Sequence, residues 1–276
     1  MQANIGGIVP LSTVDWHGRS SVVVFFNGCS FRCPYCHNFD LIEKKNPVDM
    51  DLVQKRIAGS KPFVSAVVFL GGEPLLQAAE VEEIAKIAKE NGLLVGIHTN
   101  GYFPKAVASL LEKKLADKIF VDIKAPFEPA FYMKVIGLNP EPTKSIPTPT
   151  LKSTLGPLEN TPSDKPVIEN IQKTLRLIDE SDIELEIKTT VFPGLVGSPE
   201  DISKIAAWMD ENLNGKTKLT YVLQQGNGKN ASDPVLKKTR SFEPEEMTGL
   251  ANVAKKYLKN VPVFTRTEEE GQKEIF

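Results

Sequence analysis

The sequence of 276 residues lacks the features that define several large classes of protein. No apolar run approaches the roughly 18 residues that a membrane-spanning helix needs, so we expect no membrane span. The first residues, Met1-Gln2-Ala3-Asn4-Ile5, have neither the basic region nor the apolar stretch of a secretory signal. An excess of one charge is also missing, because 33 Lys and Arg stand against 35 Asp and Glu. We therefore expect no broadly basic surface and no nucleic-acid partner.

Cysteine is scarce, and its distribution is the most informative feature of the composition. The three cysteines, Cys29, Cys33 and Cys36, all lie within one short stretch. An odd number of thiols packed this closely makes a poor disulfide framework, because one thiol must remain unpaired. Free thiols persist in a reducing compartment, so we expect a cytoplasmic protein.

Short β-rich runs alternate with amphipathic helical stretches along the chain. Most of the strand candidates are rich in Val, Ile and Phe, as buried parallel strands are. They are Val22–Phe26, Ala66–Leu70, Leu94–His98, Lys118–Ile123, Glu184–Val191, Leu219–Leu223 and, more weakly, Val261–Thr265. Helical periods fall between them at Gln77–Asn91, Ile202–Leu213 and Pro244–Leu258. The alternation of about six units predicts an α/β fold, either a barrel or a partial (β/α)6 barrel of the TIM type, with sites at the carboxyl ends of the strands.

One segment interrupts this alternation. Seven of the twenty prolines lie between Pro140 and Pro166. Proline fixes φ and removes a backbone donor, so neither helix nor strand suits this stretch. We expect an extended, mobile Pro/Thr-rich insertion at about 140–166. Because the alternating pattern resumes beyond it, residues 1–276 are predicted to form a single domain.

The cysteines lie on a predicted loop directly after the first β-rich run. Their spacing, C-x3-C-x2-C, allows three thiolates to converge on a metal centre. A structural zinc site takes four ligands, often as two separated C-x2-C pairs, and this chain has no second pair. His37 could complete a zinc site, but it is adjacent to Cys36 and has difficulty turning inward beside it. Three thiolates on a [4Fe–4S] cluster would leave one iron open, and we favour such a cluster over zinc or three inert core thiols.

The cysteine segment resembles the signature of the radical S-adenosylmethionine (SAM) enzymes, C-x3-C-x-aromatic-C, with Tyr35 as the aromatic residue. The resemblance implies a [4Fe–4S] cluster whose fourth iron is chelated by the amino and carboxylate groups of SAM. It also implies that an electron from the reduced cluster cleaves SAM to methionine and a 5′-deoxyadenosyl radical, which abstracts a hydrogen from the substrate. Because the family makes adenine contacts around the last cysteine, Tyr35 and His37 are implied cofactor contacts.

Three further segments at the ends of predicted strands resemble motifs of this family. Gly71-Gly72-Glu73 resembles the GGE motif that receives the amino group of SAM, with a plain tight turn as the alternative. Thr99-Asn100-Gly101 and Asp122-Ile123-Lys124 resemble the TNG and DLK segments of the glycyl-radical activating branch. The resemblance implies that Asn100, Asp122 and Lys124 bind the cofactor. The alternative for the last two is an ion pair at a strand end.

Later positions match the family by their place in the chain alone. Lys188 and Thr190 fall where the fifth strand of the family lines the SAM pocket. Gln225 falls where the sixth-strand loop carries a His that contacts ribose or adenine. Ordinary barrel packing is the alternative for all three. His98 stands where pyruvate formate-lyase activators carry an Asp for a monovalent cation, and since neutral imidazole is a poor ligand for a hard cation, that site is in doubt.

The amino-terminal segment indicates a branch of the family. Thr13-Val14-Asp15-Trp16-His17-Gly18-Arg19 resembles the TVDWPGR segment of anaerobic ribonucleoside-triphosphate reductase activating proteins, with His17 in place of Pro. Cys36-His37-Asn38 is typical of glycyl-radical activators. The resemblance implies a glycyl-radical enzyme as partner, most closely anaerobic ribonucleotide reductase. It also implies a low-potential electron donor such as a ferredoxin or a flavodoxin.

Two other functions remain open at this point. One is a radical SAM enzyme that acts on a small molecule or an RNA base, with the Pro/Thr-rich insertion as a substrate lid. The other is a non-catalytic iron–sulfur electron carrier or sensor. A carrier has no need of Gly71-Gly72-Glu73 or of a second ligand pocket, so this last function is the least favoured.

Overall fold

The computed structural model describes residues 1–138, 164–213 and 218–276. Most of the predicted insertion at 140–166 therefore lies outside the described residues. Helix α5 (Asp164–Asp179) begins before the expected end of that segment. Pro166 lies in the first turn of α5, where a missing N–H costs no helical hydrogen bond.

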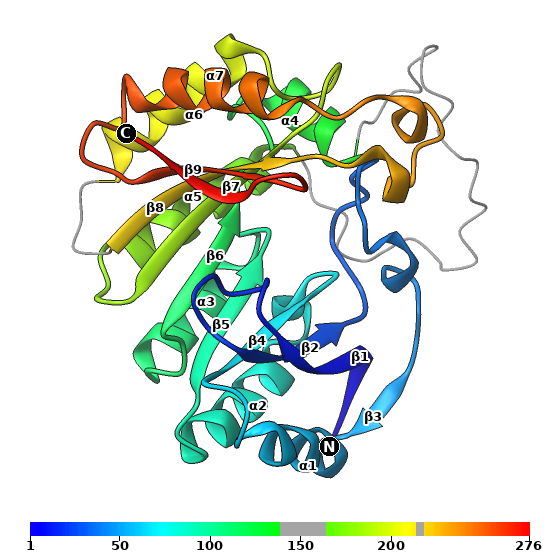
Figure 1. Ribbon diagram of the computed structural model, residues 1–276. Helices are drawn as coiled ribbons and strands as arrows, with labels where there is room; N and C mark the ends of the chain where they lie inside the picture. The colour runs from blue at the N-terminus through cyan, green and yellow to red at the C-terminus, as the bar shows by residue number, and fades with distance from the viewer. Residues whose placement is uncertain (139–163, 214–217) are drawn as a thin grey trace.

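One mixed sheet forms the centre of the described structure (Figure 1), with the strand order β10-β9-β8-β7-β6-β5-β4-β2-β1-β3. Its parallel part consists of β2 (Ser21–Phe26), β4 (Ala66–Gly71), β5 (Leu94–Thr99), β6 (Lys118–Asp122), β7 (Glu184–Val191), β8 (Lys218–Gln225) and β9 (Val263–Thr267). These strands confirm the seven predicted from apolar runs. The sheet continues into antiparallel strands at both ends, namely β1 (Gln2–Ser12) with β3 (Pro47–Asp49), and β10 (Gly271–Ile275).

Helices connect successive parallel strands and cover one face of the sheet (Figure 1). Besides α5 they are α1 (Met50–Ser60), α2 (Ala78–Glu90), α3 (Pro104–Glu112), α4 (Pro129–Val135), α6 (Pro199–Asn212) and α7 (Pro244–Lys255). The alternation of parallel strand and helix confirms the predicted α/β fold of the partial TIM-barrel type. In the described residues, no helix combines the length and apolarity that crossing a membrane requires.

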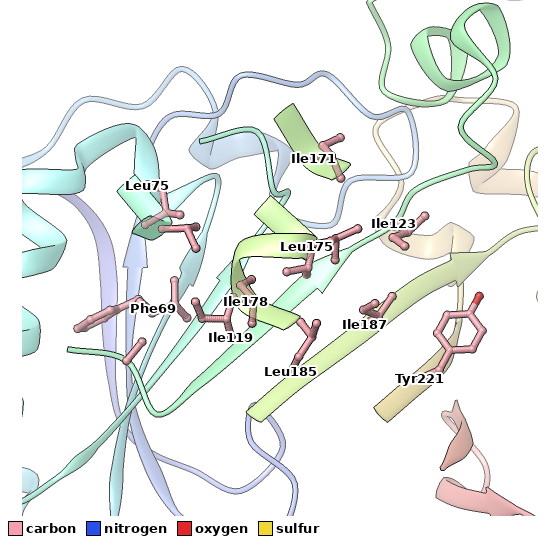
Figure 2. Close-up of a cluster of buried hydrophobic side chains, with 14 of the residues drawn as sticks. Phe69, Leu75, Ile119, Ile123, Ile171, Leu175, Ile178, Leu185, Ile187 and Tyr221 are labelled. Carbon is pink, nitrogen blue, oxygen red and sulfur yellow. The ribbon is translucent and has the colours of Figure 1, made fainter. Parts of the chain in front are cut away.

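The helix-covered face of the sheet holds the larger hydrophobic core. Its side chains come from alternate strand positions, because successive strand residues point to opposite faces. Figure 2 shows part of it, in which aliphatic residues of α5 meet residues of β6 and β7: Ile119, Ile171, Leu175, Ile178, Leu185 and Ile187. This packing fixes the positions of the strand ends that carry the predicted site.

The other, inner face of the sheet is closed at one end by the segment between β1 and β2. Trp16 of this segment is buried and meets Phe120 of β6 edge to face, with ring centroids 5.9 Å apart. It also lies against Gly96 of β5, where an added Cβ would come within 2.8 Å of the indole ring. The second hydrophobic cluster therefore lies inside the barrel, beneath the carboxyl ends of the strands.

Candidate functional site

The segment of residues 27–38, here called the cysteine loop, follows β2 at the carboxyl edge of the sheet. Its backbone is held on one side by the turn after β4, since the Glu73 N–H donates to the Gly28 carbonyl at 2.8 Å. On another side the Arg32 N–H donates to the Ile136 carbonyl, just after α4, at 2.8 Å. The loop is thus anchored between two elements that are distant in the sequence.

Two glycines at the end of β4, Gly71 and Gly72, allow the next turn to lie directly on the cysteine loop. Gly72 packs so closely that an added Cβ would stand 1.9 Å from the Gly28 carbonyl oxygen. Gly71 has a positive φ of 123°, and its added Cβ would stand 2.4 Å from the Phe26 carbonyl oxygen. The Asn38 side chain in turn donates to the Gly71 carbonyl at 3.0 Å. Only glycine fits at these positions, because a side chain at Gly72 would meet the cysteine loop and one at Gly71 would meet the end of β2.

The three cysteines are reduced thiols in largely apolar surroundings. Cys33 is buried, and Cys29 and Cys36 are partly exposed. Burial raises the pKa of Cys29 to about 12 and of Cys33 to about 11, and it raises the pKa of Cys36 as well. The nearby Lys124 ammonium lowers the pKa of each of the three thiols and so partly opposes the effect of burial. Without a metal the thiols are neutral, so metal loading must release protons.

The donor set fits an iron–sulfur cluster. In the described ranges, no three His, Cys, Asp or Glu side chains gather around one point as the ligands of a single ion would. Soft thiolates suit iron–sulfur clusters, whose ligands stand further apart than those of one ion. Two donors point at the Cys29 sulfur, namely the Phe31 N–H at 3.4 Å and the Asn100 side chain at 3.9 Å. Hydrogen bonds of this kind tune the reduction potential of such clusters.

Two predicted cofactor contacts lie at the cysteine loop: Tyr35 is part of it, and Asn100 contacts it from the end of β5. The Tyr35 hydroxyl is buried and has no hydrogen-bond partner within the described residues. Since buried polar groups are normally paired, this hydroxyl fits a site that takes a polar ligand. The Asn100 side chain donates to the Ser30 hydroxyl at 3.2 Å and accepts from the Tyr102 N–H at 3.0 Å. The end of β5 is thereby tied to the loop.

The Glu73 side chain ties the ends of β4 and β5 together. It is fully buried, and its carboxyl group accepts hydrogen bonds from the Leu75 N–H at 3.0 Å, the Thr99 hydroxyl at 2.8 Å and the Asn100 N–H at 2.7 Å. Burial raises the pKa of Glu73 to about 7, although the three hydrogen bonds oppose this shift. Both oxygens of the Glu73 carboxyl group are thus already hydrogen-bonded within the protein.

Asp122 and Lys124, at the end of β6, form the ion pair that was the alternative to cofactor binding, with Nζ and Oδ2 3.2 Å apart. The Lys188 ammonium of β7 stands 3.6 Å from the other oxygen of Asp122. Burial alone would raise the pKa of Asp122, but the two ammonium groups lower it to about 2. Lys124 also lies over the Tyr35 ring, 5.8 Å from its centroid. These charges therefore extend from the inner face of the sheet to the cysteine loop.

His98 is a neutral member of the same group. Its Nδ1 is 2.9 Å from the Lys188 ammonium, and its Nε2 is 2.9 Å from the Asp15 carbonyl oxygen. Burial and the nearby Lys188 hold the pKa of His98 well below its usual value. The neutral ring therefore accepts from Lys188 at Nδ1 and donates to Asp15 at Nε2. The sequence did not predict this link between the Thr13–Arg19 segment and the strand ends.

Three predicted contacts lie at the edges of this arrangement. His37 is exposed, and its Nε2 is 2.9 Å from the Asn227 carbonyl oxygen. Thr190 is half-buried on β7, two residues beyond Lys188. The Gln225 amide donates to the Phe242 carbonyl at 2.7 Å and to the Glu269 carboxylate at 3.2 Å, and its oxygen accepts from the Glu268 N–H at 2.8 Å. Gln225 thereby ties β8 to the turn between β9 and β10.

Comparison with known proteins gives a consistent family match. Residues 23–209 match the family model of the radical SAM superfamily. A protein of Methanocaldococcus jannaschii, provisionally named a glycyl-radical enzyme activating enzyme, is 33% identical over 96% of this chain and 97% of its own length. The pyruvate formate-lyase-activating enzyme of Clostridium pasteurianum is 34% identical over 45% of this chain and 53% of its own.

The fold has a parallel among solved structures. The chain is similar to a radical SAM methyltransferase from Sphaerobacter thermophilus, with a TM-score of 0.67. The match covers 91% of this chain and 67% of the methyltransferase at 15% sequence identity. At that identity the likeness supports the fold and not the substrate.

Proposed function

This chain belongs to the radical SAM superfamily, in its glycyl-radical activating branch, and we propose that it generates a glycyl radical on a partner enzyme. We propose anaerobic ribonucleoside-triphosphate reductase as that partner, on the resemblance of the segment Thr13–Arg19. The reaction removes one α-hydrogen from a glycine of the partner. Glycine suits this role because the flanking amides stabilise its α-carbon radical and no side chain blocks the approach.

The contact of Gly72 with the cysteine loop is the observation that carries this proposal. It brings the proposed SAM-binding turn, Gly71-Gly72-Glu73, against the loop that bears the thiols. In the proposal, Cys29, Cys33 and Cys36 hold a [4Fe–4S] cluster with one iron left for SAM. When bound, the cluster and SAM supply radical abstraction of a hydrogen atom. Because the Glu73 carboxyl is already bonded, the turn would contact SAM through its backbone.

The remaining site residues would orient the cofactor and exclude water. Lys124 keeps a positive charge beside the three thiols, which favours their ligating, deprotonated form. The free hydroxyl of Tyr35 supports a polar contact with SAM. Asn100 and His37 would stand at the walls of the pocket. The residues proposed to line its inner side are Asp122, Lys188 and Thr190, with Gln225 fixing the turn at its edge.

We also propose that residues 1–276 form one domain that works in the cytoplasm. The proposal of one domain is supported by the single sheet, which includes strands from both ends of the described chain, β1 and β10. The proposal of a cytoplasmic location is supported by the three free thiols, because free thiols persist in a reducing compartment.

Electron paramagnetic resonance after mixing with the partner tests the proposed function. Protein loaded anaerobically with iron and sulfide is reduced with dithionite, supplied with SAM and mixed with anaerobic ribonucleotide reductase. We expect a glycine-centred doublet on the reductase, which a variant with that glycine changed to alanine does not give. SAM cleavage that responds only to a small metabolite, with no doublet on the reductase, would favour the small-molecule alternative.

A further inference from the structure

Residues 227–240, here called the outer loop, cover the cysteine loop from outside. The Asp233 N–H donates to the Pro34 carbonyl at 3.0 Å, and the Ser232 hydroxyl donates to the same carbonyl at 2.9 Å. Near the start of the outer loop, the Asn227 carbonyl bonds His37. In Figure 1 the outer loop, in orange, lies beside the blue segment that follows β2. A protein that rests on the outer loop is thus separated from the cysteine loop by a single layer of chain.

The outer loop has a well-defined conformation. The buried Asp233 carboxylate accepts from the Val235 N–H at 2.8 Å and from the Leu236 N–H at 3.0 Å. The Asp233 carbonyl also accepts from the Lys237 N–H at 3.0 Å. Gly228 lies so close to the far end of the loop that an added Cβ would stand 2.3 Å from the Leu236 carbonyl oxygen. A loop fixed in this way loses little conformational entropy when a partner binds.

The exposed side of the outer loop is basic. Lys229, Lys237 and Lys238 are exposed, and none of them forms an ion pair with another described residue. Arg240 is paired with Glu246, with Nη1 and Oε2 2.6 Å apart. The chain as a whole has a formal net charge of −2, so the positive charge of the outer loop is opposite in sign to the net charge of the protein.

Two lysines of the basic surface line a hollow, and an apolar residue is exposed on the same loop. A cavity of about 310 Å³ separates the outer loop from the cysteine loop and the turn after it. Its lining includes His37, Phe39, Lys229 and Lys237, with Asp40 as the acidic group. Val235 is 56% exposed on the same loop. The lining of this cavity is mostly polar and positively charged, which fits a small contact that is steered by charge.

We propose that the outer loop and this cavity dock an acidic protein that carries single electrons. This inference rests on the proposed function, which needs one electron for the cluster in each turnover. The carrier is oxidised by one electron and the cluster is reduced by one, and no proton or other reactant is required. Because electron transfer slows steeply with distance, the donor must approach the cysteine loop closely. Encounters of this kind are small and are steered by opposite charges.

Charge reversal on the outer loop tests this proposal, with oxidised flavodoxin as an acidic probe. The variant is Lys229→Glu/Lys237→Glu/Lys238→Glu. The matched control is Lys61→Glu/Lys218→Glu/Lys259→Glu, because these exposed lysines lie just before or at the start of β4, β8 and β9, on the opposite edge of the sheet. Binding is measured by titration with cluster-loaded protein at low and high salt. We expect about tenfold weaker binding for the outer-loop variant at low salt, a smaller difference at high salt, and about wild-type affinity for the control.

A second measurement separates docking from the chemistry. SAM cleavage is driven either by reduced flavodoxin or by dithionite, which needs no docking site. We expect the outer-loop variant to lose about tenfold of the flavodoxin-driven rate and none of the dithionite-driven rate. Wild-type affinity for flavodoxin in this variant, or weaker binding of the glycyl-radical partner alone, would overturn the docking proposal. Failure of wild-type protein to cleave SAM with dithionite would overturn the proposed function and the docking proposal with it.

To allow for a folding defect, Lys238→Glu alone is tested in parallel. The Lys238 side chain is exposed and forms no ion pair with a described residue, so its reversal leaves the packing of the loop intact. We expect a smaller loss of flavodoxin affinity that again shrinks at high salt. Equal affinity for this variant and the wild-type protein at low salt would count against the docking proposal.

Discussion

The carboxyl edge of the sheet and the core beneath it are both buried, but different interactions hold them. In the core of Figure 2, aliphatic side chains of α5 pack against β6 and β7 without directional contacts. At the carboxyl edge, the hydrogen bond from the Glu73 N–H to the Gly28 carbonyl and the close packing of Gly72 hold the turn after β4 on the cysteine loop. Aliphatic packing stabilises the fold in proportion to the apolar area that it buries. The hydrogen bonds and glycines at the carboxyl edge instead fix the positions of the site residues. Substitutions at the carboxyl edge should therefore lower activity more than stability, and substitutions in the core should lower stability more than activity.

The largest effect is expected at the cysteine loop itself. Cys33→Ala removes a buried thiol that is proposed to bind the cluster, so we expect complete loss of iron binding and SAM cleavage. The metal-free variant should unfold at nearly the same urea concentration as the metal-free wild-type protein. Iron and sulfide analysis, with SAM cleavage followed by chromatography, measures the first effect. Cleavage at the wild-type rate in this variant would contradict the cluster assignment.

A smaller loss is expected when the turn is pushed off the cysteine loop. Gly72→Ala places a methyl group where only 1.9 Å separates it from the Gly28 carbonyl oxygen, so the turn or the loop must move. A displacement of about 1 Å at a reacting centre can cost about a hundredfold in rate. We expect a loss of that order in SAM cleavage with the three cysteines intact. Gly249→Ala on α7 is the control, because no atom lies within 4 Å of its added Cβ.

The core should give the opposite result. Leu175 on α5 is fully buried between the helix and the sheet (Figure 2). Leu175→Ala leaves a cavity and should lower the free energy of unfolding by about 2–5 kcal/mol. The rate of SAM cleavage for each folded, cluster-loaded molecule should stay near that of the wild-type protein. A rate that falls with stability intact would show that this part of the core also positions the site.

The smallest effect concerns the pH dependence of stability at Glu73. Its folded pKa of about 7 lies above the unfolded value of 4.5, so the folded state holds its proton more tightly. Stability from this group is therefore fully present below pH 4.5 and is lost as the pH rises through 7. Urea unfolding of metal-free protein at pH 5 and pH 8 should show a decrease of roughly 1–3 kcal/mol that Glu73→Gln lacks. Equal pH slopes in the two proteins would contradict this account of Glu73.

Local sequence patterns predicted the parallel part of the sheet but not its ends. The runs that became β2 and β4 are apolar because almost all of their residues are buried, and β5–β9 each keep a shorter buried apolar stretch. By contrast, β1 contains two glycines and a proline, and β10 is a mostly exposed strand of the sequence GQKEI. Neither shows the alternation or the apolar run that marks a strand. Their pairing depends on neighbours that the local sequence does not reveal.

The site could be predicted where a short motif carries its chemistry, and not where distant segments meet. The cysteine spacing and the two adjacent glycines at the end of β4 can be read from the sequence itself. The bond between His98 and the Asp15 carbonyl joins residues 83 positions apart, and no periodicity indicates it. Likewise, the position of Gln225 in the sequence suggested a cofactor contact. Its hydrogen bonds with Glu268 and Glu269 depend on the folded structure and could not be predicted from the sequence.

The spectrum of the reduced cluster with and without SAM tests the account most directly. Anaerobically loaded protein is reduced with dithionite, and electron paramagnetic resonance is recorded before and after SAM is added. We predict the signal of a [4Fe–4S] cluster whose shape changes on addition, because SAM takes the iron that the three cysteines leave free. A protein that retains only zinc, or a cluster signal that SAM leaves unchanged, would contradict the account.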